Sequence, residues 1–280
     1  MLSCRDILNL TRETPIVWSR KDTILYALGA GMPSDPLDER ELAFVYEDRL
    51  VAMPSLVVTL GFNDGVMGEI GYDYSQVLHG GQAITLHRPV PPEGQGLAHS
   101  RMIGAWDKGA VFAQETLLTL GGDTDPFATV VTTAFARADG GFGGMTEGQP
   151  APHAVPKRPP DRTVELATAR NQALLYRLSG DANPLHVDPE TARRAGFPEP
   201  ILHGLCTYAH CLRAVLAAWC DHDAARVRHH AVRFSTPVFP GETIAVDLWR
   251  DGDVISFEAR VKERNVTVIR NGKTLLGQSA

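Results

Sequence analysis

A glycine- and proline-rich stretch near the middle of the chain constrains the fold more than any other feature. Residues 138–162 read ADGGFGGMTEGQPAPHAVPKRPPDR and contain five glycines and five prolines, with no apolar period. Glycine and proline at this density interrupt helices and strands. We therefore predict a linker at 138–162 between an N-terminal unit, residues 1–137, and a C-terminal unit, residues 163–280.

The two units share a weak internal repeat. Residues 82–93 read QAITLHRPVPPE and residues 230–242 read HAVRFSTPVFPGE, so in each a short alternating strand runs into Pro-Val-x-Pro. More alternating stretches follow, broken by Asp-Lys-Gly or Asp-Gly-Asp, which is typical of strand–turn–strand structure. Apolar helix candidates precede them, at 203–220 in the second unit and less regularly at 53–67 in the first. The pattern predicts a duplicated unit made of a helix followed by an antiparallel sheet.

Charge balance and cysteine content narrow the partners and the compartment. The 280 residues carry 27 basic and 33 acidic side chains, a net charge of −6, so no basic excess is available for nucleic acid. Four cysteines without a CxxC pair favour free thiols in a reducing compartment. No apolar run approaches the ~18 residues of a membrane span, and the first residues, MLSCRDILNLTRETP, lack the pattern of a signal peptide. We expect a cytoplasmic protein that binds neither nucleic acid nor membrane.

The densest polar cluster lies between residues 176 and 207. Asn183 precedes a proline, which pushes the backbone out of helical geometry and forces a turn. Asp181, Asn183 and His186 therefore lie on a tight turn that can direct all three side chains toward one volume. Asp188 then predicts the N-cap of a short helix over 189–195.

A glycine at the start of the long helix candidate supplies a candidate oxyanion donor. Gly204 leaves an unpaired backbone N–H at the positive end of the helix dipole. Such a group suits a developing negative charge, for example on the enolate oxygen of a thioester. Together with a carboxylate, an amide and an imidazole, it forms a set suited to general acid–base chemistry on a carbonyl compound.

The same residues also have simpler interpretations. Asp181 and Asn183 can cap a turn, and a single histidine such as His186 is more often structural than catalytic. His186, Asp188 and His203 form a weak metal-ligand pattern, but their spacing is not that of a helix-borne zinc site. The residues by themselves leave catalytic and structural roles open.

The stretch Tyr176–Thr207 resembles the signature of MaoC-like (R)-specific enoyl-CoA hydratases. These are the type-2 hydratases of peroxisomal multifunctional enzymes and their bacterial relatives. The likeness extends over nearly the whole chain. Further motifs of that family occur in its order, at 26–31 (YALGAG), 44–47 (FVYE), 78–80 (LHG), 107–109 (DKG), 140–144 (GGFGG) and 158–161 (RPPD).

The resemblance implies an α+β double hotdog, in which each unit wraps an antiparallel sheet around a long helix. Only the C-terminal unit would keep the hydratase residues, and the N-terminal unit would widen the acyl tunnel. By this resemblance, Asp181, Asn183 and His186 would activate the water, and the N–H of Gly204 would bind the thioester oxygen. Glu47 matches an acid that the family needs for activity. Positions that contact the CoA thioester are matched by His79, Gly80, Lys108, Ala182, Pro184, Leu185 and Phe234.

The activity expected from this resemblance is the reversible addition of water to a trans-2-enoyl-CoA, giving the (R)-3-hydroxyacyl-CoA, in a stand-alone bacterial enzyme. CoA enters as part of the substrate, so we expect no separate cofactor and no metal. The family likeness also implies a homodimer. Three alternatives stay open: a dehydratase that uses the same residues on carrier-protein thioesters, a thioesterase of the same fold, and a non-catalytic acyl-CoA binding protein. The sequence leaves the acyl chain length, and the choice of base between Asp181 and His186, undecided.

Overall fold

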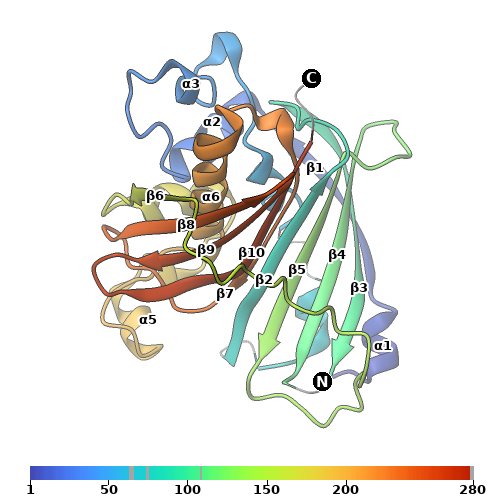
Figure 1. Cartoon of the computed structure of the whole chain (residues 1–280). Helices are drawn as coiled ribbons and strands as arrows, with labels where there is room; N and C mark the ends of the chain where they lie inside the picture. The colour runs from blue at the N-terminus through green and yellow to red at the C-terminus, as the bar shows by residue number, and fades with distance from the viewer. Residues whose placement is uncertain (63–65, 74–75, 108, 278–280) are drawn as a thin grey trace.

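An antiparallel sheet of ten strands forms the framework of the molecule (Figure 1). The computed structural model describes residues 1–62, 66–73, 76–107 and 109–277. Along the sheet the strands follow the order β1-β3-β4-β5-β2-β7-β10-β9-β8-β6. The strands are β1 (Thr11–Trp18), β2 (Val77–Leu86), β3 (Gly94–Trp106), β4 (Val111–Leu120), β5 (Ala128–Ala136), β6 (Arg162–Ala167), β7 (Val227–Phe234), β8 (Thr243–Asp251), β9 (Val254–Val261) and β10 (Val266–Leu276).

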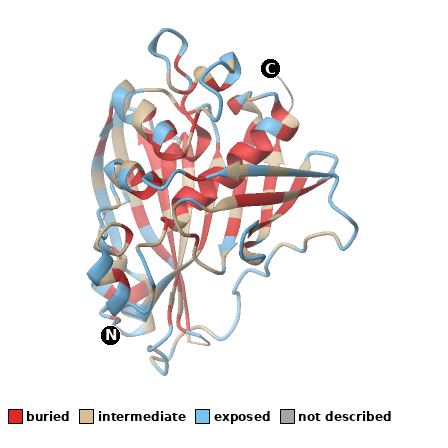
Figure 2. Ribbon diagram, turned by 90° about the vertical axis from the view of Figure 1, so that its left-hand side faces the viewer, coloured by how far each residue is buried: buried red, intermediate tan, exposed pale blue. Residues whose placement is uncertain are grey.

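The sheet curves around one long helix, α6 (Gly204–Val215), which confirms the expected helix-in-sheet architecture. Every residue of α6 after Gly204 is buried, and Figure 2 shows the buried residues concentrated on this helix and the strands around it. No helix of the described ranges is long and apolar enough to cross a membrane. The remaining α-helices are short: α1 (Cys4–Leu8), α2 (Arg20–Gly29), α3 (Glu39–Leu42), α4 (Gln172–Tyr176) and α5 (Pro189–Arg194).

The two units share this sheet instead of forming two separate ones. Strands β2 and β7 pair antiparallel, from Gly81 opposite Arg233 to Thr85 opposite His229. The backbone hydrogen bonds of the sheet therefore run without a break from the first unit into the second.

The prediction of a helix over 53–67 in the first unit is wrong. The described part of this range makes a 3₁₀-helix at Pro54–Val58, and a second one follows at Met67–Ile70, while residues 63–65 lie outside the described residues. Gly61 has a φ of +75°, and a Cβ at this position would lie 2.7 Å from the Cβ of Ala98. A φ of +75° lies outside the right-handed helical region, so the chain is not helical at Gly61, where it passes close against β3. The inner face of the first-unit strands is covered by short turns instead.

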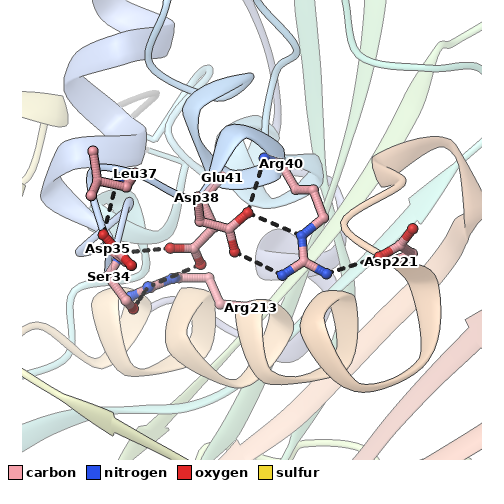
Figure 3. A network of polar contacts seen from close by, with 8 residues as sticks. All are labelled: Ser34, Asp35, Leu37, Asp38, Arg40, Glu41, Arg213 and Asp221. Carbon is pink, nitrogen blue, oxygen red and sulfur yellow. Dashed lines mark hydrogen bonds and ion pairs between the residues drawn. The ribbon is translucent and has the colours of Figure 1, made fainter.

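A buried ion pair ties α6 to the first unit. Arg213 lies 3.4 Å from Glu41, and both side chains are almost fully buried, with exposed fractions of 2% and 8%. Arg213 also donates to the carbonyl of Ala30 at 3.0 Å and to the hydroxyl of Ser34 at 2.6 Å. Figure 3 shows this cluster against the side of α6, with the 34–41 segment of the first unit above it. Because an unpaired buried charge is costly, these contacts fix the place of the helix relative to that segment.

Residues 138–161, all of which the structure describes, connect the units across the outer face of the sheet (Figure 1). The indole of Trp106 donates to the carbonyl of Glu147 at 2.9 Å, in the first unit. In the second unit, His153 pairs with the hydroxyl of Ser256 at 2.8 Å, and its carbonyl accepts from Asn271 at 2.8 Å. The segment is thus attached to strands of both units.

Candidate active site

The turn that carries the predicted catalytic residues is shaped by its own side chains. Asp181 Oδ1 accepts from the backbone N–H of Asn183 at 3.2 Å, and Asn183 Oδ1 accepts from the N–H of Leu185 at 3.0 Å. These bonds set up the 3₁₀-helix Pro184–His186. Asn183 therefore caps the turn, as its residue type favours. The expected short helix follows as α5, with Asp188 as N-cap.

The turn brings Asp181 and His186 together across a short gap. His186 Nε2 lies 3.9 Å from Asp181 Oδ2. His186 Nδ1 is 2.8 Å from the carbonyl of Ile201, and since a carbonyl only accepts, this nitrogen carries the proton. Burial lowers the pKa of His186, against the opposing influence of the Ile201 carbonyl and of Asp181. The ring is therefore neutral near pH 7, with an unprotonated Nε2 facing the carboxylate.

His203 completes this cluster, although the sequence suggested it only as a weak metal ligand. Its ring stacks on the ring of His186, with centroids 3.8 Å apart and planes 27° apart, and it is 1% exposed. His203 Nε2 donates to the backbone carbonyl of Asp181 at 3.2 Å. Burial, together with the neighbouring His186, lowers the pKa of His203 to about 4. A neutral His203 holds both catalytic candidates by stacking and by a hydrogen bond. The sequence signal for it was its place directly before the helix-starting glycine.

Gly204 begins α6 beside two aromatic rings. A Cβ at Gly204 would lie 3.3 Å from the ring of Phe234, so that ring packs closely on the glycine. Phe234 in turn contacts the ring of His79, with centroids 4.6 Å apart. His79 Nε2 lies 3.0 Å from Gln82 Oε1, and burial lowers the pKa of His79 to about 4. The first-unit residue His79 thus reaches the start of the second-unit helix.

A cavity of about 2150 Å³ connects these groups and is lined by residues of both units. The segment 149–153 contributes to its wall, together with basic side chains of β7 and β10. Asp181 is the one carboxylate among the described lining residues. The predicted site residues that line the cavity are His79, Gly80, Asp181, Ala182, Asn183, Leu185, His186, Gly204 and Phe234.

Two predicted residues, Glu47 and Pro184, do not line this cavity. Glu47 is exposed in a 3₁₀-helix, Glu47–Arg49, where its backbone carbonyl accepts a hydrogen bond from Arg20. The structure therefore separates the Glu47 carboxylate from the other predicted catalytic groups, and we do not retain Glu47 among them. Pro184 shapes the turn without lining the cavity. Lys108 lies outside the described residues.

Asp181, His186 and His203 offer atoms within 4.8 Å of one another, which raises the question of a metal ion. The geometry does not fit one. A ring nitrogen binds a metal through a lone pair in the ring plane, and the planes of His186 and His203 are stacked, 27° apart, so these lone pairs do not converge at a bonding distance of about 2 Å. His186 Nδ1 and His203 Nε2 are each committed to a backbone carbonyl.

Comparisons with known proteins place the chain in a family. Residues 151–272 match the family description "MaoC like domain", and residues 17–137 match "MFE-2 hydratase 2 N-terminal domain". An enoyl-CoA hydratase of Mycobacterium tuberculosis is 38% identical over 267 residues, which cover 92% of this chain and 93% of that protein. The chain belongs to the MaoC-like hydratase family. A second relative from the same organism, named 3-hydroxyacyl-thioester dehydratase Y, is 39% identical over 83% of this chain and 82% of its own.

Solved structures confirm the fold expected of a MaoC-like hydratase. The crystal structure of a MaoC-like dehydratase from Phytophthora capsici superposes with a TM-score of 0.90 at 32% identity, over 99% of this chain and 98% of that one. A Mycobacterium tuberculosis protein described as a double hotdog superposes with a TM-score of 0.60 at 13% identity, over 97% of this chain and 98% of that one. The α+β double hotdog is therefore confirmed, with the strands of the two units continuous in one sheet through the pairing of β2 and β7.

Proposed function

We propose that this member of the MaoC-like hydratase family adds water reversibly to trans-2-enoyl-CoA and forms (R)-3-hydroxyacyl-CoA. The observation that carries the proposal is the pairing of Asp181 Oδ2 with the unprotonated Nε2 of His186 at 3.9 Å, in a cavity that also contains the start of α6. A direct hydrogen bond would be shorter than this. One water that touches both atoms fits a gap of this size.

In the proposed step, the oxygen of that water forms a bond to C3 while His186 Nε2 takes one of its protons. The electrons of the double bond move toward the thioester carbonyl, and the N–H of Gly204 stabilises the enolate oxygen. His186 then delivers the proton to C2, so the elements of one water are added and the imidazole is neutral again. Asp181 accepts a hydrogen bond from the second O–H of the water, which stays on the oxygen as the product hydroxyl, and its charge stabilises the transient imidazolium. His186 is thus the base in this proposal.

Basic side chains in the cavity support a CoA thioester as the substrate. Arg233, Arg270 and Lys273 line it on two neighbouring strands, and Arg233 and Arg270 are directly opposite each other. Like charges placed opposite each other destabilise a sheet. An anionic ligand such as the phosphates of CoA removes this repulsion. The role expected for Lys108 at the phosphates stays a prediction.

The reverse reaction on carrier-protein thioesters is the second candidate function, favoured by the relative named as a dehydratase. It uses the same residues in the opposite direction. Comparing the kcat/KM of CoA and carrier-protein thioesters distinguishes the two, because only CoA carries the adenosine phosphates.

The decisive experiment follows the loss of enoyl absorbance and determines the chirality of the product. Asp181→Asn and His186→Ala are each expected to slow hydration by about 10²–10⁴-fold, the usual worth of acid–base catalysis. His87→Ala is the matched control, since His87 is exposed and bonds to Thr129 away from the site. Rates near wild type in the first two variants, or an (S) product, would contradict the proposal.

We further propose that the reaction needs no metal or cofactor and that the enzyme is a cytoplasmic homodimer. The stacked His186 and His203 support the first point, because their geometry does not suit an ion. Dialysis against a chelator should then leave the hydration rate unchanged. Light scattering of the purified chain tests the dimer.

A further inference from the structure

The connection between the two units is not bonded to the sheet over part of its course across the outer face (Figure 1). Glu147 accepts a hydrogen bond from Trp106 on β3, and the next attachment is His153, which bonds to Ser256 on β9. Residues 148–152 lie between these points, are exposed, and form no hydrogen bond among the described residues. We call residues 148–152 the strap.

Short side chains lie on the outer face of the sheet. Along β7 the buried residues His230 and Val232 alternate with residues that face outward. Ala231 is one of these, and it is directly opposite Lys273 on β10 and Ala83 on β2. All three line the cavity, as residues 149–152 of the strap do. Part of the cavity therefore lies between the strap and the sheet.

Basic side chains gather at this part of the cavity. His229 and Arg233 lie two residues on either side of Ala231, so they face outward as well. They line the cavity together with Lys273 and with His153, which follows the strap. Burial lowers the pKa of His153 and His229, and the positive charge of Lys273 lowers both further, so this charge lies close to both rings. We call His153, His229, Arg233 and Lys273 the outer basic cluster.

The outer basic cluster has donors that the protein does not use. The guanidinium of Arg233 and the ammonium of Lys273 form no hydrogen bond or ion pair with the described residues. His229 bonds through Nδ1 to the hydroxyl of Thr85 at 3.0 Å, whereas its Nε2 is neither bonded to the described residues nor enclosed by them. The one carboxylate among the described lining residues is Asp181, which belongs to the catalytic turn.

An unpaired basic cluster is unusual in a chain whose net charge is −6. Like charges on neighbouring strands repel one another, and a bound anion offsets this repulsion. A phosphate group offers several oxygens at once to a guanidinium, an ammonium and an imidazole, and such charge-assisted hydrogen bonds are the stronger ones.

We propose that the outer basic cluster binds a phosphate group beneath the strap, on the face of the sheet that α6 does not cover. The phosphate has two possible sources, the coenzyme of the substrate or a free phosphate ion. The first source rests on the proposed function and gives one coenzyme phosphate its place. The second is a separate ligand site that does not depend on hydration.

Calorimetric titration of the full chain with inorganic phosphate, at constant ionic strength, tests the site. Lys273→Gln should weaken binding by about tenfold, the worth of a hydrogen bond to a charged group. Arg228→Gln is the matched control, since Arg228 is exposed on the same strand as Arg233 but does not line the cavity. Absence of phosphate binding in the wild type, or the same affinity in the two variants, would overturn the inference.

A second variant separates anion binding from damage to the fold. Ala231→Glu places a carboxylate directly opposite Lys273. Opposite charges in this arrangement stabilise a sheet, so Tm should stay the same or rise while phosphate binding is lost. Wild-type affinity for phosphate in folded Ala231→Glu would contradict the assignment to the outer basic cluster.

Kinetics identify the source of the phosphate. If the coenzyme supplies it, inorganic phosphate should raise KM for an enoyl-CoA but not for the corresponding pantetheine thioester. If a free ion supplies it, phosphate should bind equally well when CoA is saturating. Phosphate binding by a chain that hydrates no enoyl thioester would overturn the proposed function alone, whereas hydration without phosphate binding would overturn this inference alone.

Discussion

Two histidines far from the proposed chemistry should make the fold sensitive to acid. His210 on α6 and His230 on β7 are both fully buried. Burial is the main cause that lowers the pKa of each to about 3, from 6.5 in an exposed histidine. Both rings are therefore neutral in the folded state across the pH range of ordinary assays.

The direction in which stability changes with pH follows from proton uptake on unfolding. Below pH 6.5 the unfolded chain binds one proton at each of these histidines and the folded chain does not, so stability falls as the pH drops from 6.5 toward 3. Each histidine contributes a slope of about 1.4 kcal/mol per pH unit. At pH 5 the loss is about 2 kcal/mol per histidine, or about 4 kcal/mol for the pair. This is a large part of the 5–15 kcal/mol that typically stabilises a folded protein.

The measurement is the free energy of unfolding in urea at several pH values between 7.5 and 5. The double variant His210→Gln, His230→Gln should show a slope against pH that is shallower than that of the wild type by about 2.7 kcal/mol per pH unit. The slope is the measure, because the substitutions also change the stability at neutral pH. His87→Gln, at an exposed position, should keep the wild-type slope. Equal slopes in the double variant and the wild type would refute the reasoning.

Two further predictions concern the buried ion pair and the basic wall of the cavity. Glu41→Gln should lower the free energy of unfolding by about 3–5 kcal/mol, because Arg213 stays buried without its counter-charge. Urea denaturation measures this change. A loss below about 1 kcal/mol would show that solvent reaches Arg213. Arg270→Gln should raise KM several-fold for an enoyl-CoA but not for the corresponding pantetheine thioester, which lacks the adenosine phosphates. Arg228→Gln is the control for Arg270→Gln, because Arg228 is exposed on the neighbouring strand and lies outside the cavity. An equal rise in KM for both thioesters would show that Arg270 does not bind the adenosine phosphates.

Local sequence signals predicted the elements whose geometry is set locally. The turn of Asp181 and His186 follows from Asn183-Pro184. The N-cap Asp188 marks the start of α5, and Gly204 is the first residue of α6. Each of these depends on residues within a few positions of one another. The turn that carries the proposed catalytic residues is therefore predictable from the local sequence alone.

Features that depend on distant parts of the chain were not predictable in the same way. Apolar residues at 53–67 resemble a buried helix, but Gly61 adopts a φ of +75° where the chain passes close to Ala98, and this close approach depends on the course of β3. His203 becomes part of the site only because α6 begins against the turn. The placement of Gln82 and Gln114 on either side of Thr132 requires the register of β2, β5 and β4. Strand register is a tertiary property that alternation alone leaves open.

The junction of β2 and β7 also has a consequence for how the chain folds as it is made. Within the first unit β2 is an edge strand, paired with β5 on one side, and its other side waits for β7. Roughly a hundred residues separate the end of β5 from the end of β7, so on a ribosome adding about 5–20 residues per second the edge stays open for on the order of 5–20 s. An open edge is a template for any other strand, including β7 of a neighbouring nascent copy. Two chains translated side by side on one messenger RNA can therefore exchange their second units, whereas the connection at 138–161, which is attached to strands of both units, favours the partner in the same chain.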